Sequence, residues 1–105
     1  MKLDNIPKEL LDEVKDKLDV TWDDNDNNIK SMIIRACNYL QSKVTQELQF
    51  TQDADEYSLL LERCRYDWNN GLDEFENNYA TEILSFIQSY ALKDWREKNG
   101  KSKNS

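Results

Sequence analysis

Hydrophobic residues recur at the spacing of an α-helix between residues 57 and 79. They are separated by three or four residues, through Tyr57, Leu61, Cys64, Trp68, Leu72, Phe75 and Tyr79. This period places the side chains on one helical face, whereas a strand would need strict alternation. Gly71 interrupts the pattern, and Gly inside a helix costs roughly 1 kcal/mol relative to Ala. Because the phase is kept on both sides of Gly71, we predict one helix over residues 54–77, straight or mildly bent; the alternative is a break between Asn69 and Gly71.

Three further stretches carry the same helical period. They predict helices at about residues 7–18, 25–45 and 79–95. Ala36 and Cys37 are small residues midway along the second of these helices, and they should let it approach the helix at 54–77 closely. The sequence therefore predicts an all-α fold, a small bundle of four helices. The predicted core comprises Leu11, Val14, Leu18, Ile29, Ile33, Ala36, Leu40, Leu61, Cys64, Trp68, Leu72, Phe75, Tyr79, Ile83 and Ile87.

The acidic connector at 19–28 invites comparison with a calcium-binding loop. An EF-hand loop that began at Asp24 would need Gly at its sixth position and Glu at its twelfth. Those positions hold Ile29 and Arg35. We therefore expect no metal site, and we assign the Asp and Asn residues of this connector to capping the next helix and favouring its dipole.

The second connector covers Thr45–Asp55 and keeps no helical stripe. Leu48 and Phe50 alternate with polar residues. We expect a loop with these one or two side chains as buried anchors, after which Asp53 or Asp55 caps the following helix. Such a loop could also contact a neighbouring subunit.

Composition narrows the class of protein. The chain has 105 residues, a net charge of −7, two Gly and one Pro. This length suits one domain, predicted at 1–95, and so little Gly and Pro disfavours a fold of many strands. The acidic balance argues against a general nucleic-acid binder, which needs a basic face. The end of the chain is basic, however, and we expect residues 96–105 to form a flexible, disordered tail, either simply solvated or ordered by a partner.

The residues needed for common catalytic and metal chemistry are scarce. The sequence contains no His, which is the usual general base near neutral pH and the commonest metal ligand. Cys37 and Cys64 form no CxxC pair, and no Gly-rich phosphate loop is present. We predict no catalytic, cofactor-binding or metal-binding residues and no enzymatic activity. No apolar run approaches the ~20 residues of a membrane span, so we expect a soluble protein of the cytoplasm.

Two segments resemble the head-tail connector (adaptor) proteins of tailed bacteriophages, in particular the small helical connectors of phages and prophages of Gram-positive bacteria. The first segment is the helix of residues 10–18, the acidic turn Trp22-Asp23-Asp24 and the helix of residues 29–40. The second is the stretch of residues 62–70 with its arginine-tyrosine step, followed by residues 72–79 with a closing Phe–Asn–Tyr pattern. Together they cover most of residues 7–92, as patterns of helices and turns rather than a catalytic signature.

The resemblance implies a structural role in the virion. Members of this family assemble as rings, commonly dodecameric, between the portal protein and the stopper or tail-completion protein, and they line the DNA channel. By this resemblance the chain would sit at the head-tail interface of the virion and reach it from the host cytoplasm. The sequence leaves open whether the free chain is a monomer or an oligomer before assembly. DNA would pass without specific binding, and we hypothesise that an acidic channel wall prevents adhesion by repulsion.

Six residues are candidates for the interface with partners, namely Trp22, Arg63, Arg65, Tyr66, Trp95 and Arg96. The alternative for the two arginines and Tyr66 is a solvated face with local pairs, such as Arg63 with Asp67. If the C-terminal helix and tail dock on the portal or the next ring, deletion of residues 93–105 should leave a folded domain that no longer attaches. A rival function is that of a small acidic regulatory or partner-binding protein, for example a DNA mimic, although 14 basic residues interrupt the anionic surface that a mimic needs.

Overall fold

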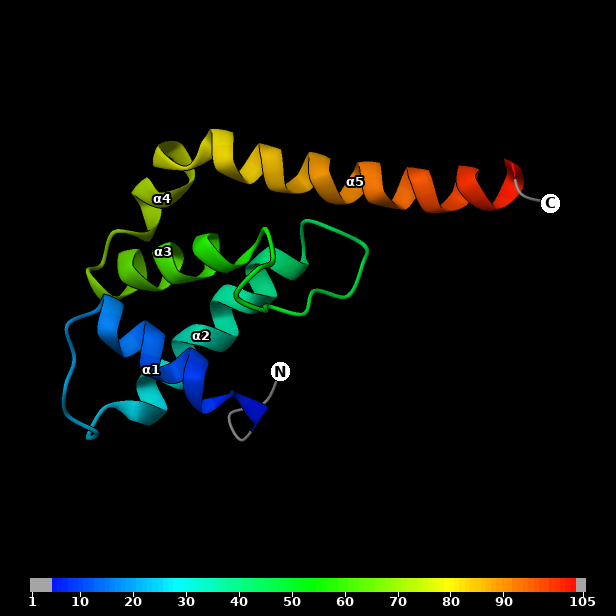
Figure 1. Ribbon diagram of the computed structural model, residues 1–105. Coiled ribbons are helices and arrows are strands. Elements are labelled where there is room, and N and C mark those ends of the chain that lie inside the picture. Colours follow the sequence, from blue (N-terminus) through cyan, green and yellow to red (C-terminus); the bar gives the residue numbers. More distant parts are fainter. Residues whose placement is uncertain (1–4, 104–105) are drawn as a thin grey trace.

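The computed structural model describes the backbone of residues 5–103 and the side chains of residues 5–98. Within these residues the chain forms five helices and no strands, which confirms the all-α prediction (Figure 1). The helices are α1 (Lys8–Lys17), α2 (Asp26–Gln41), α3 (Tyr57–Trp68), α4 (Leu72–Asn78) and α5 (Ala80–Lys103).

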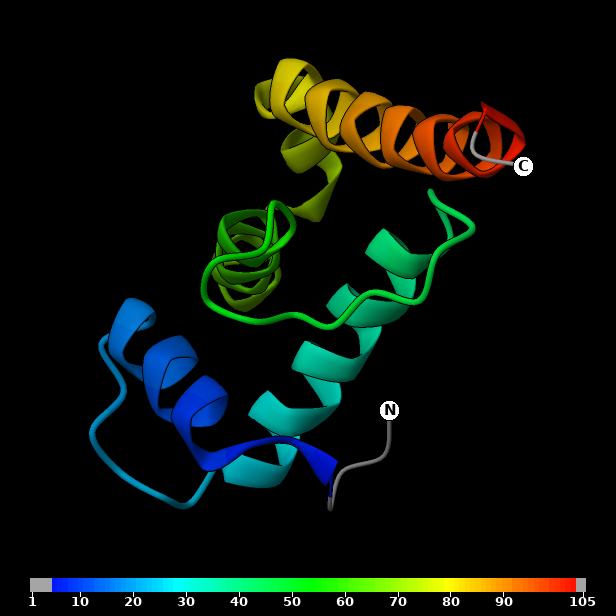
Figure 2. The same ribbon diagram turned by 45° about the vertical axis from the view of Figure 1, so that its right-hand side comes forward.

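Helices α1, α2 and α3 pack against one another and enclose the main core (Figure 2). The predicted pairing of α2 with α3 is confirmed, and Ala36 and Cys37 of α2 are both buried. Ten predicted core residues are buried: Leu11, Val14, Leu18, Ile29, Ile33, Ala36, Leu40, Cys64, Phe75 and Ile83. The remaining five, Leu61, Trp68, Leu72, Tyr79 and Ile87, are only half-buried.

The buried face of α3 is rotated relative to the prediction. Leu59 and Leu60 are 3% and 0% exposed, whereas the predicted core residues Leu61 and Trp68 are half-buried. Two neighbours explain the difference, because α3 packs on α1 and α2 and its Leu59 also lines a hollow together with Phe86 of α5. A helix that is buried on two sides has a wide apolar face. A single stripe of residues spaced by three and four predicts only part of that face.

The predicted continuous helix over residues 54–77 is wrong, because the chain turns between α3 and α4. Asn70 has a φ of 58°, and two backbone bonds close the end of α3. The amide of Gly71 donates to the carbonyl of Tyr66 at 2.7 Å, and the amide of Asn70 donates to the carbonyl of Asp67 at 3.1 Å. This is a Schellman motif, which uses a left-handed residue to satisfy the last carbonyl groups of a helix. The same motif ends α1 at Asp19, with a φ of 59°.

The left-handed conformation of Asn70 predicts opposite effects for two substitutions. Asn70→Ala should lower the free energy of unfolding by about 1 kcal/mol, because a Cβ without a compensating polar group is strained at this φ. Asn70→Gly should be neutral or stabilising by a few tenths of a kcal/mol, since Gly adopts this region freely. Urea denaturation of both variants measures the difference, and equal stability of the two would contradict the assignment.

Several helix limits also differ from the prediction. The helix α2 ends at Gln41 rather than near residue 45, and α5 continues through the basic stretch to Lys103 instead of ending near residue 95. The stretch at 96–103 thus continues the helix, where we had expected a disordered tail; residues 104–105 lie outside the described part. The predicted side-chain caps are wrong for α2 and α3, where Asn25 and Glu56 occupy the N-cap without a side-chain capping bond.

Candidate functional site

Two predicted interface residues on α3, Arg63 and Arg65, lie against an aromatic cluster of the same chain, and the third, Tyr66, is a member of that cluster. The cluster consists of Tyr39, Tyr66, Phe75 and Tyr79, with Phe75 fully buried at its centre. Arg63 covers one side, its guanidinium carbon 3.5 Å from the centre of the Tyr39 ring. A cation over an aromatic face is held by the quadrupole of the ring. The geometry therefore gives Arg63 an intramolecular role.

The other two residues are also engaged locally. Arg65 pairs with Glu62 at 2.7 Å and stands 5.0 Å from the centre of the Tyr66 ring. Tyr66 stacks edge-on against Phe75 and Tyr79, and its hydroxyl accepts a hydrogen bond from Asn78 at 3.0 Å. All three side chains are half-buried, which leaves only part of each available to a partner.

The pair that we considered between Arg63 and Asp67 is replaced by a contact between helices. Asp67 accepts a hydrogen bond from Arg35 of α2 at 3.3 Å. This bridge spans the α2–α3 interface on the surface, where such pairs contribute little stability.

The acidic connector clamps a lysine of α1. The Nζ of Lys15 lies 2.7 Å from Oδ1 of Asp23 and 2.8 Å from Oδ1 of Asp26. These hydrogen bonds raise the pKa of Lys15, and the bond from Lys15 holds the pKa of Asp23 below its ordinary value. Trp22 of the same connector is 49% exposed and donates from Nε1 to Asn25. The connector therefore ties α1 to the start of α2.

The clamp predicts a pH dependence that Asp23→Asn should remove. A depressed folded pKa contributes stability above the ordinary value of 3.8, and this contribution is lost as the pH falls through the lower folded value. At neutral pH, Asp23→Asn should therefore be less stable than the natural chain, and the difference should shrink as the pH falls below 3.8. Thermal unfolding across this range measures it, with Asp24→Asn in the same connector as a control. A difference that persists unchanged at low pH would contradict the prediction.

A buried carboxylate, missed in the sequence, anchors α5. Glu56 is 0% exposed, and its carboxylate accepts hydrogen bonds from the Phe50 amide at 3.1 Å and the Tyr90 hydroxyl at 2.6 Å. Burial and this bond to Glu56 raise the pKa of Tyr90, so the hydroxyl remains a donor. The expected loop at 45–55 is confirmed, with Leu48 buried and Phe50 half-buried. A Glu directly before an apolar helical run gives no sign that it will be buried.

Two further polar contacts hold the middle of α5. Asp55 accepts hydrogen bonds from Ser89 at 2.8 Å and from Lys93 at 3.4 Å, and these bonds hold its pKa below the ordinary value. The side-chain amide of Gln46 donates to the backbone carbonyl of Tyr90 at 2.5 Å. The loop thus fixes α5 near its midpoint, and Ile83, Phe86, Ile87 and Tyr90 add partly or fully buried apolar contacts.

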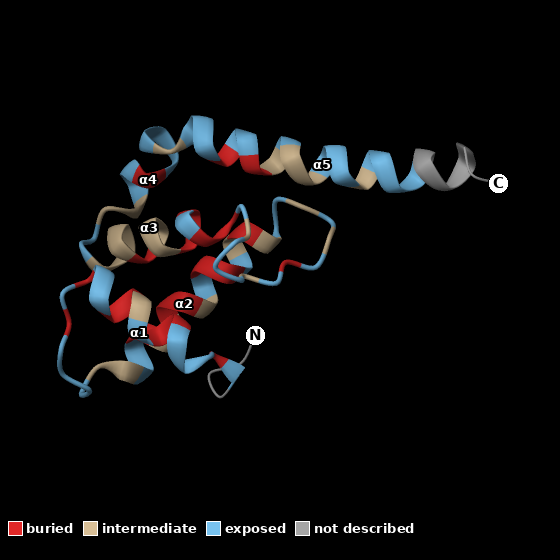
Figure 3. Cartoon of the chain, in the orientation of Figure 1, coloured by how far each residue is buried: buried red, intermediate tan, exposed pale blue. Residues whose placement is uncertain are grey.

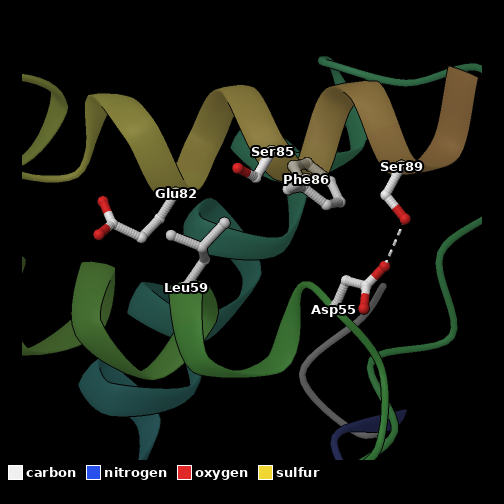
Figure 4. A pocket seen from close by; sticks show the side chains of 6 residues that line it. All are labelled: Asp55, Leu59, Glu82, Ser85, Phe86 and Ser89. Atoms are coloured by element: carbon white, nitrogen blue, oxygen red, sulfur yellow. Dashed lines mark hydrogen bonds between the residues drawn. The ribbon is translucent and has the colours of Figure 1, made fainter.

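The hollow beneath α5 has a volume of about 330 Å³ and is open to solvent. Figure 4 shows its lining, which includes the bond from Ser89 to Asp55. Its remaining lining residues are Leu59, Glu82, Ser85 and Phe86. Ser89 donates to Asp55, but this bond holds the pKa of Asp55 below its ordinary value, which makes the carboxylate a weak base for activating the serine.

The outer side of α5 carries the largest exposed apolar residues of the described chain apart from Trp22. Leu84, Leu92 and Trp95 are 54%, 47% and 58% exposed. Figure 3 colours α5 mostly as exposed, with buried residues only in its first half. The predicted interface residues Trp95 and Arg96 therefore lie at the surface, whereas sequence reasoning missed Leu84 and Leu92. Their spacing of eight residues is two helical turns and could have identified them as a second stripe.

Comparisons with protein-family models, curated proteins and solved structures found no match to this chain. None of the described helices is apolar over enough length to span a membrane. Among residues 5–98, no three His, Cys, Asp or Glu side chains are grouped so that they could hold a metal ion.

Proposed function

We propose that this chain is a structural virion assembly protein, a head-tail connector that forms a ring between the portal protein and the stopper or tail of a tailed phage. The observation that carries the proposal is α5. This helix of 24 residues lies at the edge of the molecule and extends past the body, with Leu92, Trp95 and Arg96 exposed on its far half (Figures 1 and 2). An exposed apolar stripe on a projecting helix marks a surface for a protein partner.

Two other features support an assembly role over catalysis. The lysine clamp and the aromatic cluster use charged and aromatic side chains to hold helices together. The net charge of −7 suits a ring around passing DNA, because like charges repel and prevent lasting contacts. Ring subunits meet through heterologous contacts that close about an axis, and a small helical wedge can repeat in this way.

Electron microscopy of the purified chain mixed with the portal protein of the phage that encodes it tests the proposal. We expect a ring of subunits on one end of the portal. Absence of a ring, combined with competition against DNA for a DNA-binding protein, would instead support the acidic regulatory function.

A shortened chain tests whether the basic end of α5 makes the attachment. Because Lys93 bonds to Asp55, a chain that ends at Trp95 removes the basic end and keeps the contacts of the body. It should retain its helical circular dichroism and lose attachment to the portal. Full attachment of the shortened chain would exclude docking through residues 96–105, while leaving ring formation itself open to the first experiment.

A further inference from the structure

Charge is separated along the segment formed by α4 and α5. Residues 72–82 contain Asp73, Glu74, Glu76 and Glu82 with no basic residue between them. Residues 93–103 contain five basic residues and two acidic ones. The segment thus has an acidic beginning and a basic end, and two such segments attract each other when they run in opposite directions.

The exposed apolar stripe lies between these charged ends. Successive residues of an α-helix turn by about 100°, so Leu84, Gln88, Ala91, Leu92 and Trp95 lie within about 100° of arc on α5. All five side chains are exposed. The stripe that faces the body is separate and contains Ile83, Phe86, Ile87 and Tyr90.

We propose that two copies of this chain pair through the outer stripes of α5, in antiparallel orientation about a two-fold axis at Gln88. The axis falls midway between Leu84 and Leu92. Leu84 of each copy therefore packs against Leu92 of the other copy. The basic end of each α5 then lies toward the acidic α4 and first turn of α5 in its partner. Opposed helix dipoles favour the same orientation.

The fold leaves room for this arrangement. Both views of the ribbon place α5 along one edge of the molecule with no other element beyond it (Figures 1 and 2). At 1.5 Å per residue, α5 is about 36 Å long, which accommodates an antiparallel contact over several turns. An isologous contact of this kind is the usual way in which homodimers form. The pairing concerns the free protein and stands independently of the proposed role at the portal.

Disulfide trapping of Gln88→Cys tests the position of the axis. Only a residue on a two-fold axis meets its own copy, so oxidation should link this variant into dimers. Glu97→Cys is the matched control, since Glu97 is also exposed on α5 but lies on the opposite side of the stripe. Native Cys37 and Cys64 are buried, and burial raises the pKa of Cys37 to about 11 and that of Cys64 to about 12, so they stay unreactive near pH 8.

The expected result is linkage of Gln88→Cys at least about tenfold faster than of Glu97→Cys, because two thiols held together have an effective concentration in the millimolar range. Sedimentation of the unmodified chain should show a dimer that Leu84→Asp with Leu92→Asp converts to a monomer of unchanged helical content. Equal linkage rates for the two cysteine variants, or a monomer at all concentrations up to the millimolar range, would overturn the proposal. The outer stripe of α5 would then serve only the proposed attachment to the portal protein.

Discussion

Phe75→Ala should lower the free energy of unfolding by about 3–5 kcal/mol, the range measured for large-to-small changes at buried aromatic positions. Phe75 is 0% exposed, and its ring contacts three tyrosines, with centroid distances of 6.3 Å to Tyr39, 5.6 Å to Tyr66 and 5.1 Å to Tyr79. Alanine would leave a cavity where α2, α3 and α4 meet. Chemical denaturation with urea measures the loss.

The chain offers a matched control for this substitution. Leu84→Ala removes a comparable apolar side chain that is 54% exposed, and at micromolar concentration it should change the stability by less than about 0.5 kcal/mol. If Phe75→Ala does not fold, Phe75→Leu keeps most of the volume and should cost about 1.5 kcal/mol or less. Equal effects of Phe75→Ala and Leu84→Ala would contradict the central position of the aromatic cluster.

Glu56→Ala should lower the free energy of unfolding by about 2–4 kcal/mol, because each buried donor left without an acceptor costs about 1–3 kcal/mol. The two donors concerned are the Phe50 amide and the Tyr90 hydroxyl. Since these bonds join the loop at 45–55 to α5, the substitution should also loosen α5 more than α1 or α2. Hydrogen exchange of residues 80–92 measures this local effect alongside urea denaturation.

Glu56→Gln is the informative comparison. The amide oxygen of Gln can still accept from the Phe50 amide, and the Tyr90 hydroxyl can accept a bond from the new amide group instead of donating one. The variant should therefore keep most of the stability that Glu56→Ala loses. Faster exchange spread equally over all helices in Glu56→Ala, with none concentrated in α5, would show that Glu56 does not act as the anchor of α5.

The burial of Phe75 could be predicted from the sequence, whereas the burial of Glu56 could not. Phe75 belongs to an apolar stripe with helical spacing, and its burial followed from that pattern. Glu56 is a charged residue next to a polar loop, where the sequence favours exposure. Its burial depends on Phe50 and Tyr90 arriving from segments 6 and 34 residues away in the chain.

The exposed residues of the proposed docking surface were predicted only in part. Trp95 is a candidate because exposed Trp is enriched at interfaces, and Arg96 belongs to the basic C-terminal stretch; both are exposed. Arg63, Arg65 and Tyr66 are interface candidates because they form the arginine-tyrosine step of the resemblance, and the alternative for them is a solvated face with local pairs. They instead contact aromatic rings and an acidic residue of the same chain, because the turn at Asn70 brings α4 back beside α3.

The sequence by itself determined the all-α class and the approximate place of most helices, since the period of apolar residues is a local property that each segment carries alone. It also determined the absence of His and the separation of charge along the last third of the chain. Only the tertiary structure decided which of two stripes on α5 is covered, where α3 ends and why Glu56 is buried. These features depend on contacts between elements that are far apart in the sequence. Whether a side chain is buried is decided by the element that packs against it, which its own segment does not encode.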